Sequence, residues 1–160
     1  MEQKIRLLIA DDRLPSRDGL RALAATWPQV EVAGEAGDGR EAVRQVEACC
    51  PDVVLMDIRM PAMDGLAATR IIKERWPRIR VVILTMYPVY HTEALSAGAD
   101  AFLVKGCPTE DLLRAIIGPA ESREEGQDQQ TSSGDDPRSH ATDAGVGFSA
   151  KWPFWRPKAA

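Results

Sequence analysis

Five polar residues stand at the ends of short apolar runs, and their side chains are of types that could carry out chemistry together. Each apolar run has the length and composition of a buried strand. A charged side chain packs poorly where such a strand ends, but open α/β sheets bind their ligands there. The five residues are Asp11, Asp12, Asp57, Thr85 and Lys105.

The three carboxylates predict a cation between them. Carboxylates held close together repel one another and destabilise a fold unless positive charge lies between them. Mg²⁺ suits such a site, because it takes one or two carboxylates, waters and a phosphate oxygen as ligands. Asp57 could then attack a phosphoryl group, while Lys105 and the Thr85 hydroxyl bind other oxygens of that group. For one acid alone a solvated strand end is the better interpretation, but for all five residues together we favour a phosphoryl-transfer site.

Five apolar strands that alternate with five helical segments are expected to position these residues. The strands are predicted at residues 5–10, 30–33, 53–56, 80–84 and 100–104. The helices are predicted at residues 14–27, 41–49, 64–76, 89–97 and 108–117, the last of them capped by Cys107. This alternation indicates an α/β fold, a flavodoxin-like doubly wound parallel sheet with strand order 2-1-3-4-5. Strands one and three are then neighbours, so the three aspartates should meet in one crevice.

The composition is that of an ordinary globular protein. The chain has 160 residues, of which 44% are hydrophobic and 28% charged, and its formal net charge of −4 provides no basic field for nucleic acid. The three cysteines lack the spacing of a disulfide framework or a zinc site, which indicates reduced thiols. No signal peptide or membrane-spanning run is evident. We therefore expect a cytoplasmic protein with no membrane association.

The composition changes near residue 120. Residues 121–147 are rich in polar side chains and lack apolar periodicity, so we predict one folded domain over residues 1–119 and a disordered tail over 120–160. The last ten residues are basic and aromatic and contain two prolines, which forbid a regular helix. They could form a short docking motif or have no specific role.

These residues and their neighbours resemble the receiver domain of response regulators in two-component signalling. The resemblance rests on Asp11-Asp12, on Val-Leu-Met-Asp-Ile-Arg-Met-Pro-Ala-Met-Asp-Gly ending at Gly65, on Leu84-Thr85 and on Leu103-Val104-Lys105. It covers about residues 4–118. The segments Glu-Ala-Gly-Asp-Gly at 35–39 and Pro-Asp-Val-Val at 51–54 are similar to the NarL/LuxR-type branch.

The resemblance implies a phosphoacceptor and a metal site. By this similarity Asp57 takes a phosphoryl group from a phosphohistidine on a sensor histidine kinase. Asp12 and Asp57 would bind Mg²⁺ directly, Asp11 would bind it mainly through water, and the backbone carbonyl of Arg59 would be a further ligand.

The resemblance also implies a switch. Thr85 and Lys105 would hold the phosphoryl oxygens, and Thr85 would couple to the aromatic residue Phe102 to reshape a protein-interaction surface. A phospho-dependent homodimer is a further expectation. Such a receiver assists its own phosphorylation and dephosphorylation but is not a turnover enzyme acting on an external metabolite.

Two other functions are weighed against this one. The NarL/LuxR-type branch usually carries a C-terminal helix-turn-helix, so a DNA-binding transcriptional regulator is the alternative. Residues 119–160 carry seven acidic and five basic residues and no pair of apolar-periodic helices, which disfavours nucleic-acid binding. A phosphohydrolase of the haloacid-dehalogenase kind ranks lower, since it needs Asp-x-Asp after its first strand, where this chain has Asp11-Asp12.

Overall fold

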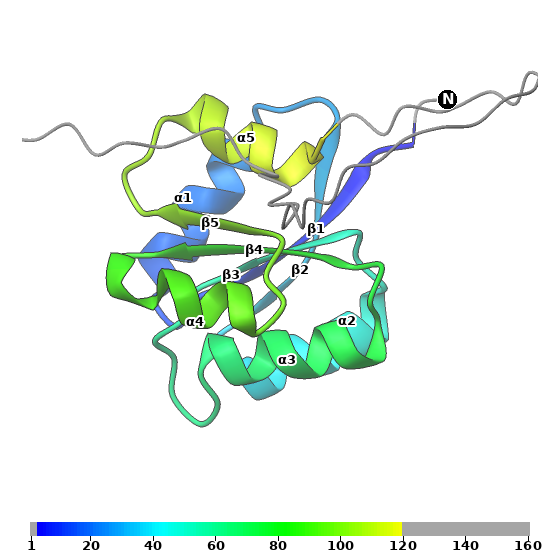
Figure 1. The fold of residues 1–160 in the computed structure, drawn as a ribbon. Helices are drawn as coiled ribbons and strands as arrows, with labels where there is room; N and C mark the ends of the chain where they lie inside the picture. Colours follow the sequence, from blue (N-terminus) through cyan, green and yellow to red (C-terminus); the bar gives the residue numbers. More distant parts are fainter. Residues whose placement is uncertain (1–2, 120–160) are drawn as a thin grey trace, which may run out of the picture. The chain divides into compact units, whose positions relative to one another are not determined.

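The computed structural model describes residues 3–119, in which a parallel sheet is covered by helices on both faces (Figure 1). The strands are β1 (Ile5–Ala10), β2 (Val30–Ala36), β3 (Val53–Met56), β4 (Arg80–Thr85) and β5 (Ala101–Val104). The helices are α1 (Leu14–Ala24), α2 (Gly39–Cys49), α3 (Gly65–Arg75), the 3₁₀ turn η1 (Pro88–Tyr90), α4 (His91–Ser96) and α5 (Thr109–Ile117). The strand order β2-β1-β3-β4-β5 confirms the predicted doubly wound α/β fold.

Both faces of the sheet are buried, because successive strand residues point to opposite faces. Leu8 and Val54 pack on the face that carries α2, α3 and α4, and Leu7 and Leu55 pack on the face that carries α1 and α5 (Figure 1). Strands buried on both sides are nearly continuous apolar runs, as β3 is. Apart from Arg6 in β1 and the two glutamates of the edge strand β2, polar side chains are therefore left to the ends of the strands.

The second strand and the second helix are longer than predicted. β2 continues to Ala36 by pairing with β1 beyond a register shift. α2 begins at Gly39 because Asp38 caps it, accepting a hydrogen bond from the backbone N–H of Glu41 at 2.8 Å. The Glu41 carboxylate in turn accepts from the backbone N–H of Gly37 at 2.7 Å, and this pair of bonds fixes the start of the helix.

The helices on either side of β5 also differ from the prediction. The predicted helix 89–97 is divided between η1 and the shorter α4. The prediction that α5 begins at Pro108 with Cys107 as its cap was wrong. Pro108 has φ −54° and ψ 141°, which is not helical, so it is itself the N-cap and the helix begins at Thr109.

No helix within residues 3–119 combines the length and apolar character that crossing a bilayer requires. The predicted tail, residues 120–160, lies outside the described residues. Its disorder and the domain boundary at residue 119 stay predictions.

The loop between β3 and α3 holds a residue in the left-handed conformation. Ala62 has a φ of 63°, and the backbone N–H of Met63 donates to the carbonyl of Pro61 at 2.7 Å, closing a tight turn. This conformation costs a non-glycine residue about 1–2 kcal/mol. Ala62→Gly is expected to raise the free energy of unfolding by about 0.5–1 kcal/mol, since the greater entropy of the unfolded chain offsets part of the gain. Urea denaturation measures this change.

Ala25 offers a matched control for this prediction. It is exposed and has a right-handed φ of −64° at the C-terminal cap of α1, so glycine relieves no strain there. Ala25→Gly is expected to lower the free energy of unfolding by about 0.4–1 kcal/mol. Equal effects of the two substitutions would contradict the strain at Ala62.

Candidate functional site

Strand pairing brings the ends of four strands together. β1 and β3 are paired up to Ala10, so Asp11 and Asp57 leave the sheet side by side, and the Asp57 N–H donates to the Ala10 carbonyl at 2.9 Å. β4 and β5 are paired up to Thr85, whose carbonyl accepts the N–H of Lys105 at 2.8 Å. The predicted convergence of these residues at one edge of the sheet is thus present in the fold.

Asp11, Asp12 and Asp57 form an acidic cluster. One carboxylate oxygen from each lies within 4.8 Å of the others. Asp11 is 2% exposed and Asp57 7% exposed, whereas Asp12 is open to solvent. Buried carboxylates are costly unless positive charge compensates them, so this cluster requires a cation.

Lys105 supplies part of that positive charge. Its Nζ donates to Asp11 Oδ2 at 2.6 Å and to Asp57 Oδ2 at 3.1 Å. Burial alone would lower the pKa of Lys105, but its hydrogen bond to Asp11 and the charge of Asp57 together hold that pKa above its usual value. Lys105 is therefore a charged ammonium placed between two carboxylates.

Asp11 is the most tightly held member of the cluster. Arg13 N–H donates to its Oδ1 at 2.9 Å, Ser16 Oγ donates to its Oδ2 at 2.6 Å, and Arg17 Nη1 donates to its backbone carbonyl at 2.6 Å. Burial raises the pKa of Asp11, but the hydrogen bonds from Lys105, Ser16 and Arg13 outweigh burial and lower the pKa below its usual value. Neither Ser16 nor Arg17 was predicted as a site residue, because no sequence pattern marks the first turn of α1 as facing the acids.

Asp57 is held more loosely. Its Oδ1 accepts the backbone N–H of Ile58 at 2.8 Å, and its Oδ2 faces Lys105. Burial raises the pKa of Asp57; the attraction of Lys105 does not offset this, and the charge of Asp11 adds to the rise. The anionic form of Asp57 therefore lacks full compensation, which a bound cation would provide.

Gly65 packs directly against the backbone of the acidic site. It is the first residue of α3, and its N–H donates to the carbonyl of Ile58 at 2.7 Å. A Cβ at this position would overlap the backbone carbonyl of Asp57. Asp64 caps the same helix by accepting from the N–H of Ala67 at 2.8 Å. The chain after Asp57 is thus fixed by the start of α3.

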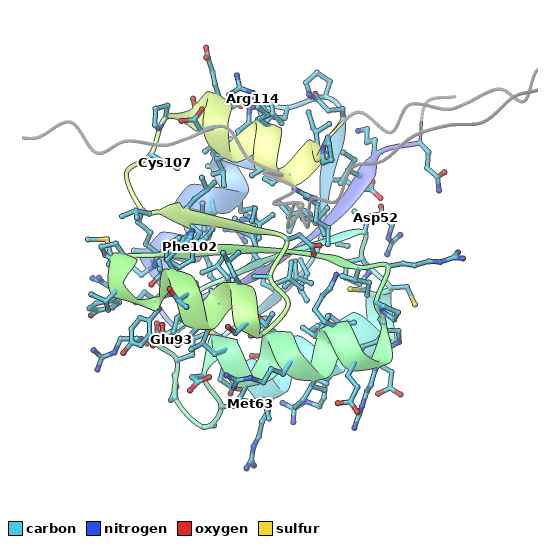
Figure 2. All side chains as sticks on the ribbon, viewed as in Figure 1. Asp52, Met63, Glu93, Phe102, Cys107 and Arg114 are labelled. Carbon is cyan, nitrogen blue, oxygen red and sulfur yellow. The ribbon has the colours of Figure 1, made fainter. Side chains whose placement is uncertain are left out.

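The two predicted switch residues lie in different surroundings. Thr85 is fully buried, and its Oγ1 accepts the N–H of Tyr87 at 3.3 Å. Phe102 pairs in register with Ile83 and lies on β5, the strand beside α4 (Figure 2). The Phe102 ring meets His91 of α4 edge to face, with ring centroids 5.1 Å apart. Phe102 therefore joins the sheet to α4, and its coupling to Thr85 stays a prediction.

An aromatic contact links the loops that follow Asp57 and Thr85. The guanidinium carbon of Arg59 lies 4.9 Å from the centre of the Tyr87 ring, a cation–π distance. Each partner stands two residues beyond a predicted site residue. The two loops that border the acidic cluster are therefore in contact through side chains.

The three cysteines are free and lie outside the acidic cluster. Burial raises the pKa of Cys49 and of Cys107, which reduces the thiolate fraction on which cysteine reactivity depends. These thiols fit the predicted reduced state, and Cys107 fits a half-buried structural role.

The donor set of the cluster fits a hard divalent cation. Three carboxylates against the single ammonium of Lys105 leave two negative charges uncompensated. Carboxylate oxygens are the ligands that Mg²⁺ prefers in proteins. Both the charge and the ligand chemistry of the site match that ion.

Comparisons with known proteins agree with this geometry. Residues 7–117 match the family model described as response regulator receiver domain. The transcriptional regulatory protein DegU of Brevibacillus brevis is 38% identical over 117 residues, which are 72% of this chain and 50% of DegU. A LuxR-family two-component response regulator from Aurantimonas is 32% identical with a TM-score of 0.68, covering 72% of this chain and 84% of that chain.

A second similar structure is the CheX–CheY–BeF3–Mg complex from Borrelia burgdorferi. It is 26% identical with a TM-score of 0.66, covering 72% of this chain and 88% of that chain. The chain spans about half the length of the curated relatives that it matches.

Proposed function

The chain belongs to the response regulator receiver domain family, with similarity to its NarL/LuxR-type members, and from this premise we propose that Asp57 is its phosphoacceptor. The observation that carries the proposal is the convergence of Asp11, Asp12 and Asp57 at the ends of β1 and β3, with Lys105 from the end of β5 bonded to Asp11 and Asp57. The chain is a signalling module and not a classical enzyme. Its activity is to hold a phosphoryl group and to change its partners when it does.

Asp57 is the nucleophile in the proposed reaction. A carboxylate oxygen of Asp57 forms a bond to the phosphorus of a phosphohistidine on a sensor histidine kinase. The phosphorus–nitrogen bond breaks, and the electron pair stays on the imidazole, which takes up a proton. The ammonium of Lys105, already 3.1 Å from Asp57 Oδ2, binds the charge that develops on the phosphoryl oxygens. The Thr85 hydroxyl holds another of these oxygens.

We assign the metal site to the carboxylates of Asp11, Asp12 and Asp57 and the backbone carbonyl of Arg59. The two uncompensated negative charges of the cluster support this assignment, as does the magnesium in the similar Borrelia complex. When bound, Mg²⁺ neutralises charge on the acids and on the phosphoryl group. Asp12, the exposed member, is the acid most open to a cation arriving from solvent.

The proposed output is a change in a protein-interaction surface. Thr85 moves toward the phosphoryl oxygens, and the space that it leaves lets the Phe102 ring turn inward. The contact of Phe102 with His91 supports a link from this movement to α4. Candidate partners are the sensor kinase and, after phosphorylation, a second copy of the chain.

A DNA-binding output is the second candidate. Two observations support it: relatives such as DegU are named transcriptional regulatory proteins, and this chain spans about half of their length. Within residues 3–119 every helix belongs to the alternating βα pattern, so we assign no DNA contact to this part. Any such output is a property of the whole protein.

Phosphotransfer from a small donor tests the proposal. With phosphoramidate, whose phosphorus–nitrogen bond resembles that of phosphohistidine, and Mg²⁺, the chain is expected to gain about one phosphoryl group in its intact mass. The label should be labile to acid and to hydroxylamine, as an aspartyl phosphate is, and a chelator should prevent it. A chain that gains no label at saturating Mg²⁺ would overturn the proposed function.

A further inference from the structure

Ser16 contacts the acidic cluster from the first turn of α1. The residue is half-buried, and its Oγ donates a hydrogen bond of 2.6 Å to Asp11 Oδ2. The same oxygen accepts the Nζ of Lys105 at 2.6 Å, while Asp11 Oδ1 accepts the backbone N–H of Arg13 at 2.9 Å. The Asp11 carboxylate is thus held at both oxygens, and its Oδ2 is held by two side chains.

The two side-chain donors on Asp11 Oδ2 differ in charge and in what else they bind. Lys105 is shared between Asp11 Oδ2 and Asp57 Oδ2, and a cation bound in the cluster repels its ammonium. Ser16 is neutral and belongs to α1, whose first turn is also tied to Asp11 by Arg17. Among the described residues, Ser16 is then the side chain that continues to orient the Asp11 carboxylate when a cation binds.

Arg13 alone cannot fix this carboxylate. Its backbone N–H holds Oδ1, about which the group can still rotate, and Arg17 binds the backbone carbonyl of Asp11 and not its carboxylate. A second point of attachment is needed to define the plane of the carboxylate. Ser16 provides it.

We propose that Ser16 is a positioning residue that orients Asp11 for a divalent cation in the acidic cluster. The inference rests on the proposed function, since it assigns Asp11 to the metal site. Hydrogen bonds that orient a metal-binding carboxylate typically change metal affinity 10- to 100-fold when they are removed. We place Ser16 at the lower end of that range, because the resemblance to receiver domains implies that Asp11 binds the ion mainly through water.

Calorimetric titration with Mg²⁺, without any phosphodonor, tests this role. Ser16→Ala is expected to weaken Mg²⁺ binding about tenfold, whereas Ser16→Thr, which keeps a hydroxyl on the same carbon, should bind within about twofold of the original chain. Ser96→Ala is the matched control, because Ser96 is exposed near the end of α4. It should bind Mg²⁺ as the original chain does.

Labelling with phosphoramidate separates positioning from a general structural effect. For Ser16→Ala the Mg²⁺ concentration at half-maximal labelling rate should rise about tenfold, while the rate at saturating Mg²⁺ stays near that of the original chain. Unchanged Mg²⁺ affinity in Ser16→Ala, or loss of affinity in Ser16→Thr equal to that in Ser16→Ala, would overturn the inference. If the original chain neither binds Mg²⁺ nor takes up phosphate, the proposed function itself fails, and the two failures are thereby distinguished.

Discussion

Replacing Asp57 by asparagine is expected to abolish phosphoryl transfer to the chain. The amide lacks the anionic oxygen that attacks phosphorus, but it keeps the shape of the side chain and can still accept the N–H of Ile58 through its oxygen. After incubation with phosphoramidate and Mg²⁺, intact-mass spectrometry should detect about one phosphoryl group on the original chain and none on Asp57→Asn.

Asp52→Asn is the matched control for this substitution. Asp52 precedes β3 (Figure 2), whereas Asp57 follows it, so the two carboxylates lie at opposite ends of one strand. The Asp52 carboxylate is exposed and accepts a hydrogen bond from the backbone N–H of Arg6 at 2.8 Å. The control should label as the original chain does. Label retained by Asp57→Asn would show that another residue is the acceptor.

Asp57→Asn is also expected to stabilise the metal-free fold. A pKa of Asp57 raised by burial means that the fold binds this proton more tightly than the unfolded chain does. The stability that comes from protonated Asp57 is present below its usual pKa and is lost as the pH rises through the raised pKa. At pH 7 the ionised carboxylate therefore opposes folding, and a neutral amide does not. With a chelator present, calorimetry should show a higher Tm for Asp57→Asn, and a lower Tm would contradict this account.

The strands and the main acids could be predicted from the sequence because their signals are local. Each of β1, β3 and β4 contains a run of four apolar residues, and Asp11, Asp57 and Lys105 directly follow strands. In a parallel sheet all strands end at the same edge, so the order of strands alone brings these residues together. Strand order and strand ends were enough to predict the centre of the cluster.

The rest of the site depends on contacts between elements, which a local pattern does not show. The hydrogen bond from Ser16 to Asp11 depends on how α1 leaves the sheet, and the left-handed turn at Ala62 depends on where α3 must begin. Pro108 illustrates the same limit for boundaries, because proline is favoured in the first turn of a helix, whereas here it lies one residue earlier, at the cap. Its backbone angles decide between the two.

Replacing Gly65 by alanine is expected to lower the free energy of unfolding by about 3 kcal/mol, at the upper end of the usual cost of overpacking. The added Cβ would overlap the carbonyl oxygen of Asp57 and approach the Cα of Ile58. Every atom in its way is backbone, so no flexible side chain can turn aside. Either the chain after Asp57 or the start of α3 must shift. Urea denaturation measures the loss, and the phosphoramidate assay should show slower labelling of the variant that remains folded.

Gly19→Ala is the matched control, because it is expected to change the stability in the opposite direction. Gly19 is exposed within α1, and a Cβ there would meet no atom within 4 Å. Alanine is favoured over glycine inside a helix by about 1 kcal/mol, so Gly19→Ala should raise the free energy of unfolding by that amount. Neither glycine has a positive φ, so backbone strain does not separate the two positions. A lower free energy of unfolding for Gly65→Ala together with a higher one for Gly19→Ala would therefore show that close packing against the Asp57 backbone requires glycine at position 65. A stabilising Gly65→Ala would refute that requirement.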